Sequence, residues 1–275
     1  VIPRYLKALK RLAMIFIVWS VFYAVVPTKN LLALPYDIAT YGIFKSYPWH
    51  VAKIPDQPLL LLLSGTKYHL WFIPALMASI SVLVLFMSLK KERYLPLLAF
   101  FLYLLSVVLF QIPNPLAEGH VYYKYFRAYC SGIAMVIFGW WLSLQTNFSI
   151  KTALKLFLVA LVFQALQDLA LWHMHHLKPN QFNSIGLVPA IFGIFIMIVC
   201  HPDFGKNTLI ARWGKMTLGI YILHPFFLDL LQELNKKIIL DVTFRDLVFP
   251  VAIAVACVFS VKLLSKNPLL KGIIS

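Results

Sequence analysis

Three ionisable side chains of this sequence stand inside long apolar runs: Asp168, His224 and Asp229. Where such runs cross a membrane, ionisable groups are costly to bury and are functional candidates by default. His224 is followed directly by Pro225, which removes a backbone donor and bends a helix. We expect His224 to be a buried acid, base or hydrogen-bond donor that lines a cavity. The alternative is that its ring caps a carbonyl freed by the bend.

The two aspartates each have a chemical and a structural interpretation. Gln164 and Asp168 are four residues apart, so on a helix they share one face and can line a polar cavity. The alternative places Asp168 one turn from the outer surface, where it meets water or a cation of a loop. Asp229 is expected close to the same outer interface.

Histidines and aromatic residues form two further groups of interest. His69 and Trp71 open an apolar run, which by itself indicates an aromatic belt with one polar group. The histidines at 173, 175 and 176 are metal-ligand types, but no carboxylate partner stands at ligand spacing, and we expect no metal site. The sequence has no GxSxG, Walker A or HExxH motif.

The amino-acid composition indicates what kind of fold positions these residues. The chain has 275 residues, of which 61% are hydrophobic and 13% charged, whereas soluble domains carry about 25% charged residues. The mean hydropathy is +0.81. These values exclude a soluble globule, a disordered chain and a disulfide-rich secreted scaffold, and the three cysteines stand singly in apolar runs. The sequence predicts an all-α, polytopic integral membrane protein.

Eight runs are long and apolar enough to be predicted spans. They cover residues 12–27, 69–89, 94–112, 128–146, 152–172, 186–201, 209–231 and 246–264. Another apolar stretch, Gln57–Ser64, is too short to cross and is predicted to be re-entrant or interfacial. We expect residues 1–275 to form a single membrane-embedded domain.

The net charge of +15 comes from short clusters of Lys and Arg between the apolar runs. Such clusters indicate contact with anionic lipid headgroups rather than with nucleic acid, which would require a continuous basic stripe. With eight spans and a cytoplasmic start, 15 of the 25 basic residues fall on the inner side. Both termini are therefore predicted to be cytoplasmic. The chain opens on Val1 and a basic amphipathic run that is typical of a loop between two membrane helices, so we expect further helices upstream.

Three strings, in this order along the chain, resemble the bacterial acyltransferase 3 family of membrane acyltransferases. The first is Lys10-Arg-Leu12 followed by Ile17-Val-Trp-Ser-Val-Phe-Tyr23, which is similar to the basic loop and third helix of that family. The second is His69-Leu-Trp-Phe72, and the third is Leu218-Gly-Ile-Tyr-Ile-Leu-His-Pro225, similar to its penultimate helix. The resemblance extends from Lys7 to the end of the chain.

This resemblance implies a bundle of ten helices that moves an acyl group, such as acetyl, from acyl-CoA to a hydroxyl of a surface polysaccharide or lipid-linked glycan. It implies location in the bacterial inner membrane, contact with membrane lipid, and no metal. Lys10 and Arg11 match the basic loop at the acyl-CoA end, where cations favour phosphates. Positive-inside anchoring explains the same two charges equally well.

For the chemistry itself, the resemblance implies a catalytic histidine on the family's first helix, which no residue here matches. The catalytic residue is therefore open, with His224 and His69 as candidates. Trp71, Asp168 and Tyr221 are expected in the substrate cavity. Two other functions stay open at this point: a non-enzymatic permease or exporter of a small anion or glycan, and a partner subunit without activity.

Overall fold

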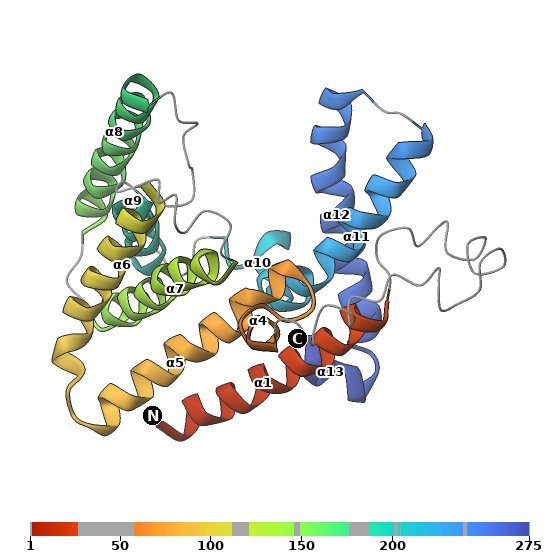
Figure 1. Ribbon diagram of the computed structural model, residues 1–275, viewed down its shortest axis with the longest axis horizontal. Helices are drawn as coiled ribbons and strands as arrows, with labels where there is room; N and C mark the ends of the chain where they lie inside the picture. Colours follow the sequence, from red (N-terminus) through yellow and green to blue (C-terminus); the bar gives the residue numbers. More distant parts are fainter. Residues whose placement is uncertain are drawn as a thin grey trace. The chain divides into compact units, whose positions relative to one another are not determined.

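The computed structural model describes residues 2–26, 58–111, 121–145, 149–175, 187–200, 203, 205–238 and 241–274. All regular secondary structure in this part of the chain is helical (Figure 1). The chain divides into two compact units: one comprises residues 78–206 with the first two residues of the chain, and the other comprises residues 3–77 and 207–275. The fold class predicted from composition, a polytopic all-α membrane protein, is confirmed.

Each of the eight predicted spans has most of its described residues on one α-helix. These helices are α1 (Ile2–Val25), α5 (Phe72–Ser88), α6 (Leu95–Gln111), α7 (Val121–Ser143), α8 (Ile150–His175), α9 (Leu187–Cys200), α11 (Thr217–Ile238) and α12 (Val242–Leu264). By length and composition, five helical stretches among the described residues can cross a membrane: Ile2–Val25, Tyr68–Ser88, Glu92–Leu109, Ile150–Ala170 and Arg245–Leu264. The helix α9 has only 14 described residues, while α7 and α11 carry more polar side chains.

Short helices fill parts of the connections. They are α4 (Pro58–Ser64), the 3-10 helices η2 (Tyr68–Trp71) and η3 (Glu92–Tyr94), α10 (Leu209–Gly214) and α13 (Pro268–Ile274). The helix α4 occupies the stretch predicted to be re-entrant, except for Gln57, which lies outside the described residues. Its seven residues are too few to span a bilayer, as expected. The predicted span 209–231 is divided, because α10 ends at Gly214 and α11 begins at Thr217.

In the unit of residues 78–206, helices pack as neighbouring pairs, α6 with α7 and α8 with α9 (Figure 1). Buried apolar side chains from α5, α6 and α7 form one core, which includes Leu83, Tyr103 and Ile137. Gly193 lets α9 approach α8 closely, because a Cβ there would come within 2.7 Å of the Cβ of Phe157. Small residues at such contacts are how membrane helices pack without a hydrophobic driving force between them.

In the other unit, α1, α11, α12 and α13 are joined by hydrogen bonds and close packing. The Trp19 indole donates to the Ile273 carbonyl at 3.1 Å, and the Tyr23 hydroxyl donates to the Ile222 carbonyl at 2.6 Å. Gly219 makes room for α13, because a Cβ there would lie 2.7 Å from the Ile274 carbonyl oxygen. These contacts fix α1 against α11 and thereby place the side chains described below.

The turn at Gly65, between α4 and η2, depends on glycine. Its φ is +66°, a left-handed conformation that costs other residues about 1–2 kcal/mol. A Cβ there would also come within 2.9 Å of the Ser20 hydroxyl oxygen on α1.

We expect Gly65→Ala to lower the thermal unfolding temperature of the purified protein clearly. The matched control is Gly139→Ala on α7, where a Cβ would meet nothing within 4 Å and the helix propensity improves. Equal unfolding temperatures for the two variants would contradict this account of the turn.

Candidate functional site

In the unit comprising residues 3–77 and 207–275, three aromatic side chains pack around the ring of His69. One of the three is His224, the other histidine considered in the sequence. We call this group the histidine cluster; it consists of Tyr23 on α1, His69 on η2, and Tyr221 and His224 on α11. Tyr23 and Tyr221 belong to the first and third strings of the family resemblance. Three segments that are far apart in the sequence therefore meet at one place.

His69 is at the centre of the histidine cluster. Its side chain is 4% exposed, and its ring centroid lies 5.1 Å from that of Tyr23 and 5.6 Å from that of His224. Tyr221 lies edge-on at 5.7 Å. Within the described part of the chain, neither ring nitrogen of His69 makes a hydrogen bond. A buried imidazole without such partners is costly, so these two nitrogens are suited to a substrate or to a proton in transit.

His224 is fixed by the proline that follows it. Pro225 lies inside α11 and has no N–H, so the Tyr221 carbonyl, four residues before it, lacks its usual helical donor. The Nδ1 atom of His224 lies 2.6 Å from this carbonyl oxygen. Because a carbonyl only accepts, Nδ1 carries the proton in this bond, and the tautomer that this bond selects has its lone pair on Nε2. The capping role considered for His224 is thus observed, and it produces the tautomer that a general base requires.

The segment Thr66–His69 is held by hydrogen bonds to two helices. The Tyr221 hydroxyl on α11 donates to the His69 carbonyl, and the Thr66 hydroxyl donates to the Ser20 carbonyl on α1 at 2.6 Å. The sharp turn at Gly65 allows the second of these contacts, because it brings the segment against α1. The histidine is therefore anchored on both sides rather than carried on a free loop.

A buried ion pair, which the sequence alone did not predict, lies beside the histidine cluster. Lys67 donates to the carboxylate of Asp229, and the two side chains are only 7% and 6% exposed. The Lys67 ammonium also lies 5.9 Å from the centre of the Tyr23 ring, a cation–π geometry. Asp229 is therefore buried against Lys67, and its place close to the outer interface stays a prediction. The one available signal was that Lys67 directly precedes the Tyr68–Trp71 string.

Two predicted cavity residues have surroundings of their own. Trp71 is half-buried, two residues after His69, and its ring packs edge-on against Phe72 at 6.3 Å. Asp168 belongs to the unit comprising residues 78–206, where both its carboxylate oxygens accept from the Gln164 amide at 3.0 Å. The predicted shared face of Gln164 and Asp168 is confirmed, while a place in the cavity stays a prediction for Asp168 and Trp71.

Of the three histidines considered as metal ligands, His173 is exposed on α8, whereas the side chain of His175 and all of His176 lie outside the described residues.

The basic pair expected to bind the phosphates of the donor lies on α1. Lys10 and Arg11 are both exposed, and the Arg11 Nε atom donates to the Gly272 carbonyl at 3.4 Å. These side chains offer positive charge at a fixed place on the same helix as Tyr23.

Comparison with known proteins identifies the family. The acyltransferase domain of the acyltransferase 3 family matches residues 1–263, nearly the whole chain. Comparison with curated proteins and with solved structures gives no match. The chain belongs to the acyltransferase 3 family, and it is a multi-pass membrane acyltransferase.

Proposed function

We propose that this member of the acyltransferase 3 family transfers an acyl group from acyl-CoA to a hydroxyl of a cell-surface polysaccharide or lipid-linked glycan, at the histidine cluster. One observation carries the proposal: His224 has its Nδ1 proton engaged by the Tyr221 carbonyl and its Nε2 available, while the adjacent His69 is buried with both ring nitrogens unbonded in the described part of the chain. This supplies one base, which is partly buried, and one donor, which is buried.

The chemistry needs only these two groups and the thioester. Nε2 of His224 takes the proton of the attacking hydroxyl as the new ester bond forms at the thioester carbonyl. The N–H of His69 stabilises the negative charge that develops on the carbonyl oxygen. The thioester bond then breaks, and the thiolate of coenzyme A leaves and recovers the proton from His224. Cleavage of the thioester provides the driving force, so the reaction requires no nucleotide hydrolysis.

Lys10 and Arg11 are proposed to hold the phosphates of the donor. An exposed guanidinium pairs with phosphate in two parallel hydrogen bonds, and an ammonium adds a point charge. The donor would then be cytoplasmic and most simply acetyl-CoA, with the acceptor reached from the outer side of a bacterial inner membrane. The predicted cytoplasmic position of both termini agrees with this arrangement.

Thioester consumption tests the proposal directly. The product of the complete open reading frame is reconstituted in liposomes with acetyl-CoA and a glycan extract of the cell envelope, and release of free coenzyme A is followed together with acetyl ester on the glycan. We expect both products to form in equal amounts and to depend on the glycan. Movement of labelled glycan or acetate across the membrane without thioester consumption would overturn the proposal in favour of a permease.

A further inference from the structure

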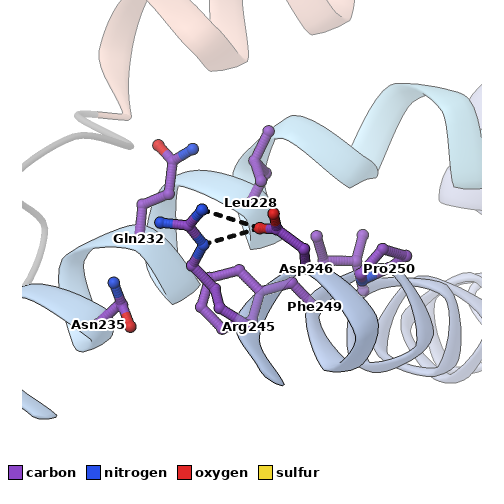
Figure 2. Close-up of a pocket in the computed structure, with 8 residues that line it drawn as sticks. Leu228, Gln232, Asn235, Arg245, Asp246, Phe249 and Pro250 are labelled. Atoms are coloured by element: carbon purple, nitrogen blue, oxygen red, sulfur yellow. Dashed lines mark hydrogen bonds and ion pairs between the residues drawn. The ribbon is translucent and has the colours of Figure 1, made fainter. Parts of the chain in front are cut away.

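A pocket in the unit of residues 3–77 and 207–275 lies between α11 and α12 (Figure 2). Its volume is about 450 Å³. Polar side chains contribute to its lining from both helices, together with apolar ones. The lining residues are Leu228, Gln232, Asn235, Arg245, Asp246, Phe249, Pro250 and Ile253.

The charges in this pocket cancel. The Arg245 guanidinium donates to the Asp246 carboxylate through Nε at 2.9 Å and contacts it through its second nitrogen at 2.8 Å (Figure 2). Among the described residues of the lining Arg245 is the one cation, and an anion would have to compete with the Asp246 carboxylate for it, so an anionic headgroup is disfavoured. The pocket is therefore suited to an uncharged, polar ligand.

The remaining polar groups both donate and accept. Gln232 contributes an exposed amide with two N–H donors and one carbonyl acceptor, and Asn235 contributes a second amide, which already interacts within the protein. Pro250 lies inside α12, so the backbone carbonyl of Asp246, four residues before it, has lost its helical donor and can accept from a ligand. Phe249 adds an apolar ring to the lining. Vicinal hydroxyls on a ring with an apolar face are the chemistry that such a set recognises.

His224 of the histidine cluster and the α11 residues of the pocket lie along the same face of α11. At 3.6 residues per turn, His224, Leu228, Gln232 and Asn235 project on the same side of the helix. Gln232 is eight residues beyond His224, which places it roughly 12 Å further along the helix axis. A ligand that reaches His224 with one hydroxyl can therefore extend to Gln232 with a neighbouring part.

We propose that this pocket binds an uncharged sugar unit of the acceptor glycan, adjacent to the unit that is acylated, and so selects the acceptor. The inference rests on the proposed function and adds a binding site to it. Gln232 and Asn235 would be the specificity-determining residues, and Phe249 would lie against the sugar ring.

Saturation-transfer NMR tests this binding without any need for acyl transfer. The detergent-solubilised product of the complete reading frame is titrated with neutral trisaccharides of glucose, galactose and N-acetylglucosamine, and separately with glycerol 3-phosphate. We expect a neutral trisaccharide to bind, and Gln232→Leu to weaken that binding about tenfold, because the substitution keeps the shape and removes the hydrogen bonds. Asn235→Leu serves as a second variant with the same expectation.

The matched control is Asn207→Leu, which removes an exposed amide outside the pocket and should leave the affinity unchanged. Absence of binding by all three trisaccharides, or equal affinity in the Gln232 and Asn235 variants, would overturn the assignment. Binding of glycerol 3-phosphate that is lost in these variants would overturn it too, in favour of a lipid headgroup. Trisaccharide binding in a protein that consumes no thioester would uphold the pocket and reject the proposed function.

Discussion

Replacing His224 by alanine is expected to lower the rate of acyl transfer by about 10²–10⁴-fold, the range that a general base contributes. The Nδ1 atom of His224 is bonded to the Tyr221 carbonyl, so the ring's lone pair is on Nε2. This lone pair is proposed to accept the proton of the attacking hydroxyl. The measurement is the rate of coenzyme A release at saturating acyl-CoA and acceptor, with protein amount and unfolding temperature recorded for each variant.

His173→Ala is the control for this prediction, because His173 is an exposed histidine on α8, in the other unit. Its activity should equal that of the unaltered protein. A His224→Ala variant that folds and keeps full activity would remove His224 from the reaction.

Breaking the buried ion pair is expected to destabilise the protein by about 3–5 kcal/mol, because either Lys67→Met or Asp229→Asn takes the opposite charge away from a side chain that stays buried. The side chains are 7% and 6% exposed, so water cannot replace the missing partner. Thermal unfolding in detergent measures the loss. The double variant Lys67→Met with Asp229→Leu should recover most of it, because an apolar pair of similar volume replaces an ion pair at little cost.

Lys206→Met is the control for the ion pair. Lys206 pairs with Asp203 on the surface, where the side chains are 72% and 81% exposed, and such pairs contribute about 0–1 kcal/mol. If the double variant is as unstable as the two single variants, the charges of Lys67 and Asp229 do not act through each other.

The fold class and the two histidines could be predicted from the sequence because both depend on local information. Long apolar runs directly indicate helices. His69 and His224 belong to sequence strings that occur in the same order as in the acyltransferase 3 family. Pro225 further indicated a freed carbonyl, which is the one that His224 binds.

The ion pair could not be predicted in the same way. Lys67 and Asp229 are separated by 162 positions, and no periodicity connects them. Each residue alone has an ordinary interpretation, a loop cation and an interfacial carboxylate. Only the packing of η2 against α11 shows that the two charges neutralise each other. The single-domain organisation of residues 1–275 and the inner and outer sides of the chain stay predictions.

We propose that His69 and His224 act as one catalytic unit. The most direct test compares the acyl-transfer rates of His69→Ala, His224→Ala and the variant that carries both substitutions. Residues that act as a unit show strongly non-additive losses. We predict that the double variant is no slower than the slower single variant. Losses that multiply, or a single variant with unchanged activity, would show that the two histidines do not share one reaction centre.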